Sequence, residues 1–300
     1  LAVAVRVGTG RTALDIGPLS VTVDAADRAI ELASGDLSCG AELTGYSPLA
    51  RHLAQRSAAL AFAGDLGRSR EDGERALAIA RKRGETEIVV VASNALHLHA
   101  FFSGEPGNGV MLAREVLRLA DEAVAGYVPS SARLGLGIAC IAAGRLPEAI
   151  ETLEDGLRKA RSSSVLAEEC YLVTYLAWAH QAAGDGEAAL RVAEGAMELV
   201  ARRGARVMEC ALLVARAAAY RLSGAGGSRD KADSDLMAAC ELIEAVGAYA
   251  LLPFVHAELA EQALAAGDGA TAQRERSEAE RLFAAIGATA HTARMGSLAS

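Results

Sequence analysis

Apolar and polar residues recur along this chain with the period of an α-helix, in runs that end at glycines. The segment 146–160 is an example, and its apolar face is formed by Leu146, Ala149, Ile150, Leu153 and Leu157. The glutamates of the same segment lie away from that face. Apolar residues three and four positions apart predict an amphipathic helix with one buried side.

Two series of glycines divide these runs at regular intervals. The first series, spaced by forty residues before its last member, contains Gly64, Gly104, Gly144, Gly184, Gly224 and Gly267. The second contains Gly84, Gly126, Gly204, Gly247 and Gly287. Glycine suits the left-handed cap that ends a helix, so each unit is predicted to be a helix, a turn and a second helix.

This repeat predicts an all-α superhelix of about six helical hairpins over residues 23–287. Residues 1–22 are expected to form an incomplete or irregular N-terminal hairpin, in which 19–23, LSVTV, could be extended. Residues 288–300 are expected to be a C-terminal capping segment.

The third unit carries a family resemblance. It has Leu136-Gly137 in its first helix, Gly144 at the turn, Ala149 at the small crossing position, and Gly156-Leu157 near its end. This pattern resembles the tetratricopeptide repeat, although Cys140 stands where an aromatic residue is usual. A period of forty, against about 34 in that family, implies longer helices.

A second resemblance rests on residues 45–48, Gly-Tyr-Ser-Pro, and on Leu282-Phe283, Gly287-Ala288-Thr289 and His291 near the end. These elements resemble the C-terminal helical region of bacterial class III adenylate/guanylate cyclases that carry an AAA-like ATPase module. The chain is also similar to helical arrays of large ATP-dependent transcription activators. The resemblance implies that catalytic domains belong to a parent protein and lie outside this chain.

Charge and composition narrow the candidate partners. The net charge is −8, and acidic and basic residues are interleaved without a basic block, so we expect neither nucleic acid nor an anionic membrane surface as a partner. No apolar run approaches the ~20 residues of a membrane span, and no signal peptide is visible. The five cysteines are widely spaced without a Cys-x-x-Cys pair, which indicates reduced thiols and a cytoplasmic location. The chain lacks an initiator Met, so we expect it to be a piece of something longer.

The opening stretch, residues 5–12, reads VRVGTGRT and is similar to a strand followed by a phosphate-binding loop. A Walker loop would need a glycine where Val5 stands and a lysine where Arg11 stands. As a dinucleotide fingerprint, Gly8 and Gly10 fit, but no parallel sheet is predicted downstream to hold the loop. We therefore interpret this stretch as part of the first hairpin.

No other constellation indicates catalysis, a cofactor or a metal. His97 and His99 point in different directions on a helix and cannot share a metal ion. The acidic runs at 70–74 and 167–169 are interpreted as solvated helix faces. We therefore expect no enzymatic activity in this chain.

The first helices of stacked hairpins line the concave side, which is the usual partner surface. The repeat register gives a candidate concave surface of Phe62, Leu98, Phe101, Phe102, Leu134, Ile138, Tyr171, Trp178 and Phe254. The indole of Trp178 is expected to be partly exposed there. Arg51, Asn94 and Arg221 are expected to lie too far apart to clamp a carboxylate together. If the register is off by one residue, the same side chains are inter-helix core.

Together these features predict a non-enzymatic protein-interaction and regulatory arm of a larger bacterial signalling protein of the cyclase or ATPase type. Its partner would be another protein or the neighbouring domains of its own parent chain. Two alternatives remain open at this point. One is a ligand-sensing array of a transcription activator, with a small apolar effector in the groove, and the other is a stand-alone helical adaptor.

Overall fold

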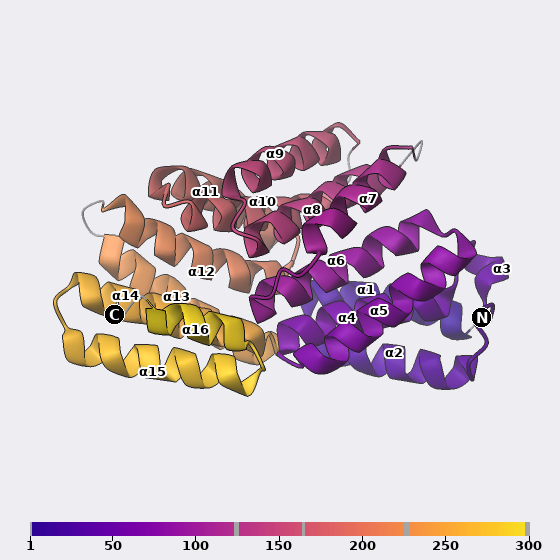
Figure 1. Ribbon diagram of the computed structural model, residues 1–300, viewed down its shortest axis with the longest axis horizontal. Coiled ribbons are helices and arrows are strands. Elements are labelled where there is room, and N and C mark those ends of the chain that lie inside the picture. The colour runs from indigo at the N-terminus through magenta and orange to yellow at the C-terminus, as the bar shows by residue number, and fades with distance from the viewer. Residues whose placement is uncertain (1, 123–125, 164–165, 225–227, 298–300) are drawn as a thin grey trace.

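The computed structural model describes residues 2–122, 126–163, 166–224 and 228–297, and these residues form helices joined by short turns (Figure 1). No strand occurs in these ranges. The first helices of seven hairpins are α1 (Ala2–Ile16), α4 (Pro48–Ala63), α6 (Thr86–Ser103), α8 (Val128–Ala142), α10 (Leu166–Ala182), α12 (Arg206–Ser223) and α14 (Leu252–Ala265). Their partners are α2 (Leu19–Ala33), α5 (Leu66–Arg83), α7 (Gly109–Asp121), α9 (Leu146–Ser162), α11 (Gly186–Arg202), α13 (Ser228–Val246) and α15 (Gly269–Ala285). The remaining elements are α3 (Ala41–Thr44), the 3-10 turn η1 (Tyr249–Leu251) and α16 (Thr289–Ser297).

The predicted hairpins from α4 to α15 are present, and the glycines mark their turns. Gly64 and Gly144 have φ values of +91° and +69°, a region that side-chain-bearing residues rarely adopt. The residue after the glycine then begins the next helix in several units. Asp65 and Asp268 accept hydrogen bonds from backbone N–H groups three residues later, at 3.2 and 3.0 Å. In these units the glycine ends one helix and the aspartate after it caps the start of the next, so two adjacent residues mark the turn.

The N-terminal segment differs from the prediction. Residues 19–23 are helical rather than extended, and the proposed boundary at residue 23 falls inside α2. α1 and α2 form a seventh hairpin that packs against α4. The hydroxyl of Thr22 donates a 3.1 Å hydrogen bond to the carbonyl of Gly10, within the stretch that resembles a phosphate loop. Packing against neighbouring helices overrides the β-propensity of the β-branched residues.

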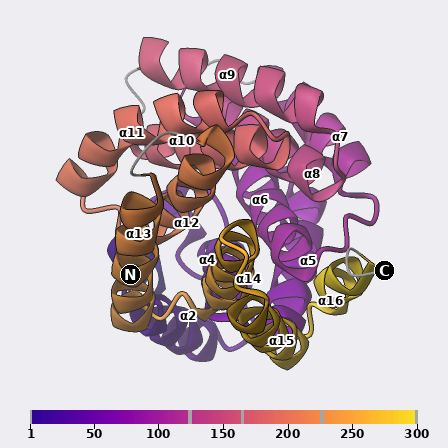
Figure 2. The same ribbon diagram turned by 90° about the vertical axis from the view of Figure 1, so that its left-hand side faces the viewer.

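The superhelix closes on itself, as the end-on view in Figure 2 shows. The first helices of the hairpins lie inside and the second helices lie outside. α1 contacts α12, η1 contacts α4, and α16 contacts α6, so the two ends of the array meet. The approach is tight at Gly17, where an added Cβ would lie 2.7 Å from the Val246 side chain.

Candidate functional site

A cavity of about 210 Å³ lies on the inner side of the superhelix, among α1, α4, α6, α8 and α10. Its wall is mostly aliphatic, with one phenylalanine: Leu14, Ala54, Ala58, Phe62, Val91, Ala95, Leu98, Leu134 and Ile138. The polar lining residues are Arg11, Arg51, Gln55, Asn94, Tyr127, Ser131, Glu168 and Tyr171. An apolar wall with a small number of polar groups is the usual composition of a small-molecule site.

Arg51 of α4 is held on one side of this cavity by two acceptors. Its Nη1 donates to Glu87 at 3.1 Å and to the hydroxyl of Tyr127 at 2.8 Å, and that hydroxyl donates to Glu87 at 2.7 Å. The residue is 8 % exposed, and its buried Nε has no hydrogen-bond partner in the described part of the chain. One edge of the guanidinium is therefore occupied while the Nε edge has no protein acceptor.

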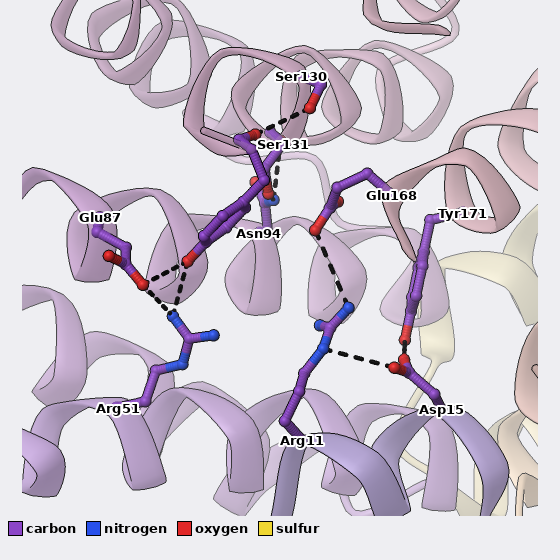
Figure 3. Close-up of polar contacts among 10 residues, drawn as sticks. Arg11, Asp15, Arg51, Glu87, Asn94, Ser130, Ser131, Glu168 and Tyr171 are labelled. Atoms are coloured by element: carbon purple, nitrogen blue, oxygen red, sulfur yellow. Dashed lines mark hydrogen bonds and ion pairs between the residues drawn. The ribbon is translucent and has the colours of Figure 1, made fainter. Parts of the chain in front are cut away.

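Arg11 of α1 faces the same space from the other side (Figure 3). Its nitrogens lie 3.5 Å from Asp15 and 3.9 Å from Glu168, which are ion-pair distances longer than a normal hydrogen bond. Its guanidinium also lies over the ring of Tyr171, 5.6 Å from the centroid. In Figure 3 Arg51 and Arg11 rise from neighbouring helices, with Glu87 on the far side of Arg51 and Asp15 on the far side of Arg11.

Two amide side chains in the wall are fixed by the backbone of neighbouring helices. Gln55 donates to the carbonyl of Val7 at 3.1 Å, and its Oε1 would lie 2.9 Å from a Cβ added to Gly10. Asn94 donates to Ser131, at 2.9 Å to its carbonyl and 3.0 Å to its hydroxyl. The Oδ1 atom of Asn94 occupies the place of a Cβ at Gly135. The amide oxygens therefore lie against helix backbones.

Glu168 of α10 is the acidic residue of the lining. Its side chain is 7 % exposed, and burial raises the pKa of its carboxyl, a rise that the positive charge of Arg11 opposes. Tyr171, one turn further along, donates a 2.6 Å hydrogen bond to Asp15. These contacts join α1 to α10 at the rim of the cavity.

The structure divides the predicted concave surface into two groups. Five of its nine members line the cavity: Phe62, Leu98, Leu134, Ile138 and Tyr171. The others lie in an aromatic cluster, in which the rings of Phe101 and Trp178 are 5.3 Å apart and those of Trp178 and Phe254 are 5.4 Å apart. Phe102 packs beside Phe101 at 5.2 Å.

Within this cluster, the expectation that Trp178 is partly exposed is wrong. The residue is 7 % exposed, and its indole N–H donates to the carbonyl of Ala211 at 2.9 Å. Phe101 and Phe102 are buried as well. The physical reason is closure of the superhelix, because α14 brings Phe254 onto rings that an open array would leave in a groove.

Two other expectations about charged residues are corrected. Arg51 and Asn94 line the same cavity and are not far apart, whereas Arg221 lies at a second, smaller cavity and pairs with Glu258 at 2.7 Å. The acidic runs are not wholly solvated either. Asp72 is 6 % exposed and accepts two hydrogen bonds from Arg56, at 2.6 and 2.8 Å.

Sequence reasoning assigned no binding role to Arg11 or Glu168, both of which line the cavity. The sequence places Arg11 only where a phosphate loop would have its lysine, and Glu168 only within a run typical of a solvated helix face. The signal in the sequence is a pair of acidic residues, Glu168 and Glu169, in the first turn of α10, a helix whose other residues are mainly apolar. The described residues contain no group of three or more His, Cys, Asp or Glu suited to a metal ion. None of their helices is both long and apolar enough to cross a bilayer.

Comparison with known proteins identifies the fold. The sequence matches no protein-family model, and a search of curated proteins gives no match. A solved structure from Pyrococcus horikoshii, a Signal Transduction ATPase with Numerous Domains with a tetratricopeptide repeat sensor, aligns with a TM-score of 0.50 and 13% identity. The alignment covers 89% of this chain and 43% of that one. IFIT1 in complex with m7Gppp-AAAA aligns with a TM-score of 0.48 and 17% identity, over 91% of this chain and 58% of that one.

The chain is an all-α superhelix of tetratricopeptide-like hairpins. It spans less than two thirds of the length of either solved protein. At 13% identity the likeness to the ATPase concerns the fold alone, and the sensor role belongs to that protein.

Proposed function

We propose that this chain is a non-enzymatic recognition module, the regulatory arm of a larger bacterial signalling protein of the cyclase or ATPase type, and that it senses a small ligand in the central cavity. The observation that carries the proposal is the cavity itself, with an aliphatic wall and polar groups from α1, α4, α6, α8 and α10. A ligand that touches all these helices would bias how α1, in the first hairpin, packs on α10, in the fifth.

The cavity favours ligand sensing over the binding of a protein helix along the concave side. Closure of the superhelix buries Phe101, Phe102 and Trp178 against one another, so an anchoring helix would have to displace them. A small molecule in the cavity needs no such rearrangement. A sensor role is also the one named for the tetratricopeptide region of the Pyrococcus horikoshii ATPase. The partner of the arm would then be a neighbouring domain of the parent protein. That domain would respond to a change in how the hairpins pack.

The proposal is tested with an uncharged fluorescent probe, N-phenyl-1-naphthylamine, whose emission rises in apolar surroundings. Ala58 lines the cavity and Ala142 does not, and both are 8 % exposed on inner helices. We expect saturable binding to the unmodified chain and to Ala142→Phe, and at least a tenfold weaker affinity for Ala58→Phe because the new ring fills the cavity. Equal binding to both variants, or no saturable binding at all, would contradict the proposal. The purified chain is expected to hydrolyse neither ATP nor GTP.

A further inference from the structure

We infer that the central cavity binds a small amphiphilic carboxylic acid, with its carboxylate between Arg11 and Arg51 and its apolar part against the aliphatic wall. This inference rests on the proposed function, because it names the chemical class of the ligand at the same site. It is carried by the hydrogen-bonding groups that the cavity leaves without a protein partner.

The first of these groups is the Nε edge of Arg51. Glu87 and Tyr127 occupy Nη1, whereas Nε is buried and has no acceptor in the described part of the chain. A buried guanidinium N–H without an acceptor costs free energy, which a carboxylate oxygen from a ligand would recover. A planar carboxylate matches the two parallel N–H groups on one edge of a guanidinium.

The second group is Arg11, whose acidic neighbours hold it loosely. The distances of 3.5 Å to Asp15 and 3.9 Å to Glu168 leave its donors without a hydrogen bond of normal length. Asp15 instead accepts the short 2.6 Å bond from Tyr171. Because Arg11 and Arg51 line the same cavity, we expect one anion in it to contact both.

The charged residues in the lining itself are also relevant, whereas Glu87 and Asp15 contact the two arginines from outside the lining. Arg11, Arg51 and Glu168 are its charged residues, two positive and one negative. The unpartnered amide oxygens of Gln55 and Asn94 lie against Gly10 and Gly135, so they offer no acceptor to a ligand cation. The groups that remain for a ligand are therefore mainly donors.

The apolar wall determines the size and polarity of the ligand beyond its carboxylate. A volume of about 210 Å³ exceeds the ~150 Å³ of an engineered apolar cavity that binds benzene. Leu14, Phe62, Leu98, Leu134 and Ile138 provide surface for a short alkyl chain or one ring, and no second charged cluster lines the far side. A highly polar ligand, such as a sugar phosphate, would leave its hydroxyls unpaired against this wall.

The test compares octanoate, octanamide and octylammonium as competitors of bound N-phenyl-1-naphthylamine at pH 7.5 and low ionic strength. Each of these molecules has eight carbons in an unbranched chain and they differ in the head group, so the unmodified protein alone tests the inference. We expect octanoate to displace the probe at a concentration at least tenfold lower than either of the other two. Equal potency of octanoate and octanamide would overturn the inference, and a preference for octylammonium would replace it with a cation site.

Variants then assign the preference to residues. Arg51→Met and Arg11→Met should each abolish the advantage of octanoate over octanamide, whereas Glu168→Gln should strengthen octanoate binding by removing a like charge. Arg158→Met is the control, since Arg158 is exposed on α9, away from the cavity. If the cavity is instead a cation site, Glu168→Gln should weaken the binding of octylammonium. If the probe binds but the head group of the competitor has no effect, the cavity binds small molecules and only the inferred ligand class is wrong. If neither the probe nor octanoate binds, the proposed function is wrong.

Discussion

The hydroxyl of Tyr171 donates a 2.6 Å hydrogen bond to the carboxylate of Asp15, across 156 residues of sequence. Tyr171 lies on α10 and Asp15 on α1, so the bond joins the first hairpin to the middle of the array. A simple stack of hairpins would have contacts only between neighbours. This bond, with the contact of α1 and α12, makes the array a closed body with an interior.

Tyr171→Phe should weaken this closure. The change leaves the ring in place and removes the donor to a carboxylate, and we expect a loss of about 1.5 kcal/mol in the free energy of unfolding. Chemical denaturation measures the loss, and hydrogen exchange should show reduced protection in α1. Tyr249→Phe, at a residue 48 % exposed, is the matched control and should change neither. An unchanged α1 in the Tyr171 variant would show that the bond does not hold the first hairpin.

Trp178→Ala should destabilise the chain as the loss of a core residue. The indole is 7 % exposed and contacts Phe101 and Phe254, so we expect a cost of about 3–5 kcal/mol. As Trp178 is the chain's single tryptophan, its fluorescence reports this site alone. The emission should be blue-shifted and protected from an aqueous quencher. Ready quenching with a small stability loss would instead support an exposed, concave position.

His97 should make the chain sensitive to acid. Burial lowers the pKa of His97 to about 4, below about 6.5 in the unfolded chain. Its contribution to stability is therefore complete above pH 6.5 and is lost as the pH falls toward 4. Between pH 7.5 and 4.5 the unmodified chain should lose about 2.5 kcal/mol more than His97→Gln. Other buried histidines such as His52 are common to both proteins, so parallel pH profiles would contradict this assignment.

The five cysteines should separate into two classes of reactivity. Burial raises the pKa of Cys140 and Cys170 to about 11 and that of Cys210 to about 12, so these thiols are protonated and shielded at neutral pH. Cys39 and Cys240 are partly exposed. An aromatic disulfide reagent should modify at most two thiols of the native chain, and the other three on unfolding. Replacing Cys39 and Cys240 by serine should remove the fast phase, and a fast phase that persists would place a buried thiol at the surface.

The hairpins follow from local sequence, and closure does not. The forty-residue spacing of Gly64, Gly104 and Gly144 predicts the turns. This works because the left-handed conformation that ends a helix depends on only a few adjacent residues. No short segment of the sequence indicates the small rotation between successive hairpins. That rotation nevertheless determines whether Asp15 comes within hydrogen-bond distance of Tyr171. The expected exposure of Trp178 is wrong for this reason, because it holds only for an open array of hairpins.

The candidate site was predictable in its apolar part and at Arg51, but not at Arg11 and Glu168. The repeat register identifies inner-helix residues such as Leu134 and Ile138, which line the cavity. Arg11 and Glu168 reach it from helices 150 residues apart, and each has a plausible surface role when α1 or α10 is considered alone. Charges in an amphipathic pattern are usually solvated, and only the closed superhelix gives these two a common interior.

The most direct test of ligand sensing is to locate the bound probe within the chain. Isoleucine δ1 methyl groups can be labelled and observed by NMR, and Ile138 lines the cavity whereas Ile243 and Ile286 do not. On titration with N-phenyl-1-naphthylamine, the Ile138 methyl signal should shift in proportion to binding, while the signals of Ile243 and Ile286 stay in place. Shifts at those two methyls with an unchanged Ile138 would contradict the central cavity as the ligand site.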